Sequence, residues 1–203
     1  MFALVEDNAF VKIVNSSKGI TIGDNQYPKT IFSLWSNAER EAIGIYEVVM
    51  DATNQKDEAY YINTNVSYAY SSGTVTGSYG TATAKPIADI LFEDGDEIPS
   101  DKAVGDIKSY GLKGLEIKKI KAQASGLLSP TDWHVVKATE VSDYNVPSNV
   151  ATYRTNVRAK SNEMETQINA CSDVDALKTL FTWVYDKDTN TSSRPLASFP
   201  EEI

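Results

Sequence analysis

Residues 66–79 read Val-Ser-Tyr-Ala-Tyr-Ser-Ser-Gly-Thr-Val-Thr-Gly-Ser-Tyr, and they decide the fold class expected for the first half of the chain. Large side chains recur at Val66, Tyr68 and Tyr70, which places all three on one face of a strand because side chains alternate between the two faces. The Ser71–Gly73 turn then leads into a second β-prone run. Two such runs joined by a tight, glycine-containing turn predict a β-hairpin.

Further strands are predicted on both sides of this hairpin. The runs are short, rich in β-branched or aromatic residues and bounded by turn residues, and they cover residues 10–14, 19–23, 43–50 and 60–70. One short helix interrupts them, because Ser36 and Glu39 have the capping-box spacing in which each side chain satisfies a free backbone amide. This helix is expected to end at about Ala42. We therefore expect a β-rich module over residues 1–92.

The second half has the apolar spacing and the capping residues of helices. From Leu112 to Leu128 the apolar residues recur at spacings of three and four, which is one face of a helix: Ile117, Ile120, Ala124 and Leu127. Ser129 and Pro130 suit the cap and the first position of a helix that is expected to reach about Glu140. A longer helix is predicted over residues 149–171. A second capping box, over residues 172–175, predicts a last helix that ends near Tyr185.

Residues 93–101, Glu-Asp-Gly-Asp-Glu-Ile-Pro-Ser-Asp, separate the two halves. Their acidic side chains repel one another and, with a glycine and a proline, favour a solvated linker. The alternative is a cation-binding loop, although the stretch lacks the regular Asp-x-Asp-x-Asp-Gly spacing and the closing Glu. The predicted organisation is α+β, with a β-rich module 1–92, an acidic linker 93–108, a helical bundle or hairpin module 109–185 and a loose polar tail 186–203.

The composition excludes several classes of protein. The chain has 203 residues with one Cys and one His, which rules out an internal disulfide framework, a Cys-x-x-Cys metal knot and a multi-histidine metal site. The net charge of −9 argues against a large nucleic-acid footprint, which needs clustered Lys and Arg. No apolar run is long enough to span a membrane, and residues 1–7 lack the pattern of a signal peptide. We expect no cofactor, no metal, no nucleic-acid partner and no membrane insertion.

Residues with catalytic potential are few. His134 could act as a general base or be a partly exposed helix residue. Cys171 lies on the apolar side of its predicted helix, where a buried, inert thiol and a nucleophile are the two interpretations. The sequence has no Gly-x-Ser-x-Gly elbow and no phosphate-binding Gly-x-x-x-x-Gly-Lys loop. No catalytic residue is assigned, and a glycan hydrolase that uses paired carboxylates remains an alternative.

Tyrosines are concentrated on the predicted strands. Those singled out as candidate partner-binding residues are Tyr61, Tyr68, Tyr70 and Tyr79. Alternation along a strand places some tyrosines in a core and others on the surface, where exposed tyrosine is a contact residue in protein and sugar interfaces. The sequence leaves both interpretations open.

Two segments resemble a known family. The first is residues 27–46, Tyr-Pro-Lys-Thr-Ile-Phe-Ser-Leu-Trp-Ser-Asn-Ala-Glu-Arg-Glu-Ala-Ile-Gly-Ile-Tyr. The second combines Leu-Leu-Ser-Pro-Thr-Asp-Trp at 127–133, Val-Pro-Ser at 146–148 and Tyr-Arg-Thr-Asn-Val-Arg at 153–158. Together they resemble the tail proteins of bacteriophages, in particular the small tail-fibre assembly or tail-chaperone proteins and related marine phage tail proteins.

The resemblance implies a β-rich front half joined to a helical rear half that carries these motifs. It also implies a non-enzymatic tail protein that binds a tail fibre or a neighbouring tail protein and supports its assembly or attachment. Such a protein acts in the virion tail or in the host cytoplasm during assembly, and a homo-oligomer in the virion is a further expectation. The long polar tail and the lack of a coiled-coil stem depart from the family pattern, so a retained component and a transient chaperone both stay open.

Three residues of the second segment are further partner-binding candidates. Trp133 is expected to be buried against Tyr153 and to anchor two helices on each other. Arg154 and Arg158 lie four residues apart on one helix face, where they either pair with acids or stay solvated. The alternative function is a carbohydrate- or receptor-binding module of the tail fibre, with the tyrosine-rich strands as the sugar platform.

Overall fold

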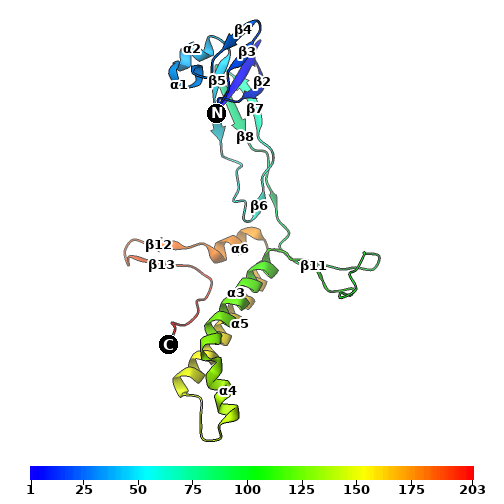
Figure 1. The fold of residues 1–203 in the computed structure, drawn as a ribbon, viewed down its shortest axis with the longest axis vertical. Helices are drawn as coiled ribbons and strands as arrows, with labels where there is room; N and C mark the ends of the chain where they lie inside the picture. Colours follow the sequence, from blue (N-terminus) through cyan, green and yellow to red (C-terminus); the bar gives the residue numbers. More distant parts are fainter. The chain divides into compact units, whose positions relative to one another are not determined.

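The computed structural model describes residues 1–203 and divides the chain into two compact units, 1–83 and 84–203 (Figure 1). The first unit is rich in strands and the second contains the long helices, so the fold class is α+β as predicted. The division follows Thr83, whereas the sequence placed the end of the first module at residue 92. No helix in the structure is both long and apolar enough to cross a membrane.

A five-stranded sheet forms the centre of the first unit. Its strands run in the order β2-β1-β5-β8-β7, with β1 over Phe2–Glu6, β2 over Ala9–Val14, β5 over Ile45–Asp51, β7 over Ser67–Ser71 and β8 over Thr74–Ser78. Neighbours are antiparallel except for β5 and β8, which are parallel. The predicted hairpin is β7–β8, in which Ser71 pairs with Thr74. Ser72 and Gly73 have φ values of 50° and 81°, as a two-residue mirror-image turn requires.

Both faces of this sheet are covered by apolar side chains, because alternate residues of β1 point to opposite faces. On one face, Leu4 packs in a cluster with Val14, Ile20, Ile31 and Ile45. The elements over this face are β3 (Ile20–Ile22), β4 (Asn25–Tyr27), α1 (Ile31–Leu34) and α2 (Asn37–Glu41). On the other face, Ala3 and Val5 pack with Val48 and Val75.

The capping box at the start of α2 is present as predicted. The Glu39 amide donates to Ser36 Oγ at 3.3 Å, and the Ser36 amide donates to Glu39 Oε2 at 2.8 Å. The Ser36 hydroxyl also donates to Glu39 Oε2, and the bonds from the Ser36 amide and hydroxyl lower the pKa of the Glu39 carboxyl. Arg40, on the same helix, is buried and lies over the ring of Phe2, where it donates to the backbone carbonyl oxygen of Trp35.

The strand predicted over residues 60–70 is two strands in the structure. β6 covers Tyr61–Ile62 and pairs with β9, Thr83–Ala84, whereas β7 begins at Ser67. Asn63 explains the interruption, since its side chain bonds both backbone groups of Lys56, accepting from the amide at 2.9 Å and donating to the carbonyl at 2.8 Å. Such side-chain bonds compete with a strand ladder.

Two antiparallel helices form the body of the second unit. α3 covers Leu112–Leu128 and α5 covers Ser148–Ala170, and they lie side by side in Figure 1. Lys113, near the start of α3, donates to the carbonyl oxygen of Asn169 near the end of α5. Between them the chain passes through the 3-10 turn η1 (Ser129–Thr131) and α4 (Asp132–Glu140). These helices begin and end close to where the sequence predicts.

The last helix, α6, is shorter than expected. It covers Val174–Phe181 and ends four residues before Tyr185, the predicted limit. The predicted capping box is replaced by a single cap, in which the Asp173 carboxylate accepts the Ala176 amide at 2.8 Å. Because this bond favours the ionised form, the pKa of Asp173 is lowered.

The acidic stretch is a hairpin loop of the second unit. β10 (Ile90–Leu91) pairs with β11 (Ile107–Ser109), and the predicted linker 93–108 supplies the loop and much of β11. The Glu93 amide donates to Asp96 Oδ2 at 2.9 Å, and Lys108 forms an ion pair with Asp96 at 2.5 Å. The amide bond, and after it the lysine, lowers the pKa of Asp96. In the alternative interpretation, a cation-binding loop, Asp96 would face a metal ion, whereas in the structure its partner is Lys108.

The predicted loose tail is also folded. β12 (Val184–Asp186) and β13 (Thr191–Ser193) form a hairpin, after which Leu196 is buried and its amide donates to the Leu180 carbonyl oxygen at 3.1 Å. The Gln167 side chain then bonds the tail backbone twice, donating to the carbonyl of Pro195 and accepting from the amide of Ala197. The prediction missed this docking because its apolar contacts are isolated residues in a polar stretch.

Limited proteolysis of the native protein is expected to cut first within residues 93–106. Most of these residues are exposed, and they lie between short strands with few backbone bonds to hold them. Mass spectrometry of the first fragments would locate the cut. A first cut inside α5 would contradict this assignment, since that helix is packed along α3.

Candidate functional site

α4 contributes no side chain to a hydrophobic core. None of its residues is buried, and the side chains of Trp133 and Val136 are 53% and 52% exposed. The prediction that Trp133 is buried against Tyr153 is therefore wrong. The two residues lie three apart on one helix face, and the adjoining Val141 is also exposed, so α4 presents an apolar surface.

Arg154, rather than Trp133, connects α5 to the start of α4. Its side chain is buried, and it donates to the Leu128 carbonyl oxygen at 2.9 Å and to Thr131 Oγ1 at 2.6 Å. It also forms an ion pair with the exposed Asp132, at 2.8 Å. One cation on α5 thus binds three groups: the carbonyl at the end of α3, the 3-10 turn and the first residue of α4.

Arg158 is placed differently from Arg154, although both share a helix face as predicted. It is exposed, and its guanidinium donates to the carbonyl oxygen of Arg154 at 3.4 Å. Pairing with an acid is thus found for Arg154, whereas Arg158 has no carboxylate within ion-pair distance.

Four residues form an aromatic and cationic cluster around α4. The rings of Trp133 and His134 stack at 3.7 Å, and the ring of Tyr144, from the loop after α4, lies 6.4 Å from that of Trp133. Lys137 places its ammonium group 4.4 Å from the centre of the Tyr144 ring. We name these four residues, with Val136, the α4 platform.

The α4 platform has the composition of a protein contact surface. Aromatic side chains supply large contact areas at a small entropy cost, and the Lys137 ammonium lies over both the Tyr144 ring and, at 5.9 Å, the Trp133 ring. His134 Nδ1 contacts the hydroxyl of Tyr144 and so belongs to this cluster. The sequence singled out Trp133 but missed Tyr144 and Lys137, because nothing in the spacing shows that the following loop returns to the helix.

The four tyrosines do not gather on one exposed surface. Tyr61 is buried, and Tyr68 and Tyr70 pack against the apolar cluster around Val48 and Val75. Tyr68 stacks on Phe10 at 5.2 Å, and Tyr70 contacts the ring of Tyr46 at 5.0 Å. Tyr79 is half-buried beyond the end of β8. The core interpretation therefore fits Tyr61, Tyr68 and Tyr70.

Cys171 is a partly buried thiol. It follows the last residue of α5 and donates to the Gln167 carbonyl oxygen at 3.5 Å. Burial raises the pKa of this thiol, whereas a nucleophilic cysteine needs a lowered one. No group of three or more His, Cys, Asp or Glu side chains is arranged to hold a metal ion.

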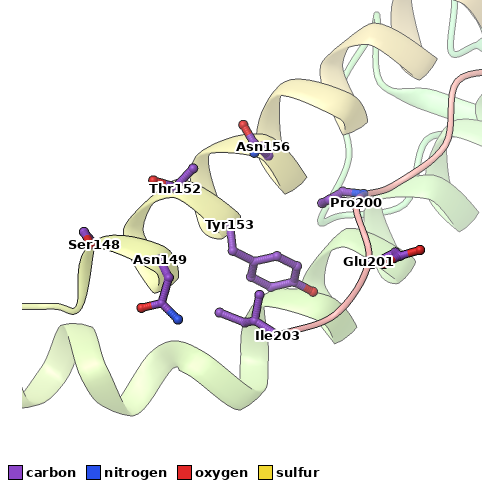
Figure 2. A pocket seen from close by; sticks show the side chains of 8 residues that line it. All are labelled: Ser148, Asn149, Thr152, Tyr153, Asn156, Pro200, Glu201 and Ile203. Carbon is purple, nitrogen blue, oxygen red and sulfur yellow. The ribbon is translucent and has the colours of Figure 1, made fainter.

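A shallow hollow lies between the start of α5 and the end of the chain. Figure 2 shows the Tyr153 ring pointing toward Ile203, with polar side chains of α5 beside it. The lining residues are Ser148, Asn149, Thr152, Tyr153, Asn156, Pro200, Glu201 and Ile203. The Tyr153 hydroxyl donates to the Leu127 carbonyl oxygen at 3.5 Å, so its polar end is already used within the helical body.

Comparisons of the chain with protein-family models, with curated proteins and with solved structures found no match.

Replacing Arg154 is expected to destabilise the helical unit more than replacing Trp133. Arg154→Ala leaves Thr131 Oγ1 without a donor, while the Leu128 carbonyl keeps only the hydrogen bond from Thr131 Oγ1 at 2.8 Å. The loss of a partner costs about 1–3 kcal/mol for a buried polar group. Trp133→Ala removes a half-exposed side chain and should cost less than about 1 kcal/mol, as is usual for surface positions. Urea unfolding followed by far-ultraviolet circular dichroism measures both.

Arg158→Ala is the matched control for the first variant, because it removes the same side chain from an exposed position one turn later. Its expected cost is about 0.5 kcal/mol or less. Equal losses from Arg154→Ala and Arg158→Ala would contradict the role assigned to Arg154.

Proposed function

We propose that this chain is a non-enzymatic bacteriophage tail protein that binds a tail fibre or a neighbouring tail protein and supports its assembly or attachment. The observation that carries the proposal is the α4 platform, an exposed apolar and aromatic surface on a helix with no buried residue. The phage assignment itself rests on the sequence resemblance.

The exposed apolar side chains of α4 add packing energy only when a partner covers them. Short helices are marginal in water, and most of their stability in proteins comes from packing of an apolar face. α4 lacks such packing within its own unit. Contact with a partner would bury the Trp133 and Val136 side chains, and buried aromatic anchors dominate the energy of protein interfaces.

The two motifs that carry the rear part of the resemblance contact each other. Asp132, from the Leu-Leu-x-x-Thr-Asp-Trp motif, forms an ion pair with Arg154 from the Tyr-Arg-x-x-Val-Arg motif. This contact gives both motifs a structural role, which is to hold the start of α4 against α5. Trp133 directly follows Asp132, so the same contact sets the position of the platform. A scaffold of this kind fits a protein whose function is to present a surface.

The carbohydrate-binding alternative has less support. It requires the tyrosine-rich strands to form an exposed platform, and Tyr61, Tyr68 and Tyr70 are used in packing instead. As a tail protein the chain would occur in the virion or in the host cytoplasm during assembly. Mass spectrometry of purified virions distinguishes these sites, because only a retained component is found in the particle.

Substitution of the α4 platform is expected to weaken binding to the partner. The chain is co-expressed with the product of the adjacent tail-fibre gene, and the complex is measured by size-exclusion chromatography and titration. Trp133→Ser with Val136→Ser should weaken the complex at least about tenfold, since interface aromatic residues often contribute more than 1.4 kcal/mol.

The control for this experiment is Leu115→Ser on α3, where another exposed apolar side chain is lost away from the platform. It should leave the affinity unchanged. Equal weakening by both variants, or separate elution of the wild-type proteins at micromolar concentration, would reject the proposed surface. Turnover of a host polysaccharide by the purified chain would instead favour the hydrolase.

A further inference from the structure

The β12–β13 hairpin and its flanks form an exposed arm, which we define as residues 183–194 (Figure 1). All six strand residues are exposed. Three consecutive large side chains are more than half exposed: Trp183 at 56%, Val184 at 61% and Tyr185 at 55%. An isolated two-stranded hairpin is marginally stable in water, so this arm lacks the packing that usually supports such strands.

The arm offers β12 no apolar partner. Across the hairpin, Val184 faces Ser193 and Tyr185 faces Ser192, so small polar residues stand opposite the large side chains. Large cross-strand pairs are what normally stabilise a sheet. The unused apolar surface therefore lies on β12, and it requires a partner strand with large side chains.

Both aromatic rings of the arm are already held in place. The Arg194 guanidinium lies 5.0 Å from the centre of the Trp183 ring, and the Tyr185 hydroxyl donates to Asn190 Oδ1 at 2.6 Å. Trp183 and Tyr185 are two residues apart, so they share one face of the strand while Val184 lies on the other. A partner would thus meet ordered side chains, which lowers the entropy cost of association.

The outer edge of β12 is a second unsatisfied feature. β12 pairs only with β13, so every second residue directs its amide and carbonyl away from the hairpin. An edge of this kind is a template for another strand. Nearby charge does not oppose this, because the arm contains Asp186 and Asp188 against Lys187 and Arg194 and is neutral within a chain of net charge −9.

We propose that the outer edge of β12 pairs antiparallel with β12 of a second copy of this chain, about a two-fold axis at Val184. In this register Trp183 stands opposite Tyr185 of the second copy, and Val184 stands opposite its own equivalent. Each aromatic residue then gains the cross-strand partner that β13 does not provide. A neutral arm is also the place where two acidic chains approach with the least repulsion.

The pairing would be weak, because two short strands bury much less than the roughly 1,200–2,000 Å² that is typical of stable interfaces. A dimer that forms with a dissociation constant of about 10–100 μM is expected for such a small contact. The inference is independent of the α4 platform, because the arm and the platform share no residue.

Symmetric disulfide trapping tests the register in the full chain. In a Cys171→Ala background, Val184→Cys places two thiols at the two-fold axis, where they should cross-link under mild oxidation. Asp186→Cys is the matched control on the same exposed strand. Its two copies would lie about 14 Å apart along the strands, four residues at about 3.4 Å each. That exceeds the roughly 7 Å limit between Cα atoms of a disulfide.

Sedimentation at increasing concentration provides the second measurement. Wild-type protein should show a concentration-dependent dimer that Trp183→Ser with Tyr185→Ser abolishes, whereas Trp133→Ser with Val136→Ser retains it. The proposal is overturned if Val184→Cys stays monomeric on oxidation, if Asp186→Cys cross-links as efficiently, or if the wild-type chain is monomeric at several hundred μM, well above the expected constant of about 10–100 μM. Binding of the arm only to a different protein would also overturn it.

Discussion

The guanidinium of Arg154 holds together three consecutive pieces of the second unit. A buried cation of this kind is stable only when its donors are used, and here they meet the last carbonyl of α3, a threonine hydroxyl of the 3-10 turn and a carboxylate at the start of α4. The Asp132 partner is itself exposed, so only one of the two charges is removed from water. This arrangement fixes the direction in which α4 leaves α3, and the platform depends on that direction.

The apolar residues of the chain are divided among small clusters. In the first unit a single sheet is covered on both faces, so β1 contributes to two clusters at once. In the second unit Tyr153, Val157 and Ala124 form a cluster between α3 and α5, with Phe199 of the tail against it. Trp133 and Trp183 lie outside these clusters with more than half of each side chain exposed, on surfaces that a partner could use.

Local signals predicted local structure well. The turn at Ser72–Gly73 was predictable because only residues that tolerate positive φ suit it, and α3 was predictable because its apolar residues keep the helical period. The capping box at Ser36 was equally visible, since both bonds lie within four residues.

Contacts between distant residues were not predictable in the same way. Periodicity shows that Trp133 is on a helix, but it does not show that Arg154 fills the space behind that helix. The docking of Leu196 and the return of Tyr144 to α4 depend on single residues in polar segments, where no pattern repeats. For the same reason the candidate site was found in part, through Trp133, while most of its members required the structure.

The two bonds from Gln167 to the tail backbone, with the Leu196–Leu180 bond, also determine how the arm is attached. The chain leaves the helical body at α6 and rejoins it at Leu196, so the arm is a loop closed at its base. The entropy of closing a loop grows only slowly with its length. The arm could therefore gain or lose residues, or be cut at its tip, while the segment that follows stays docked on α5. The length and sequence of its tip are free to change independently of the helices and of residues 183–185.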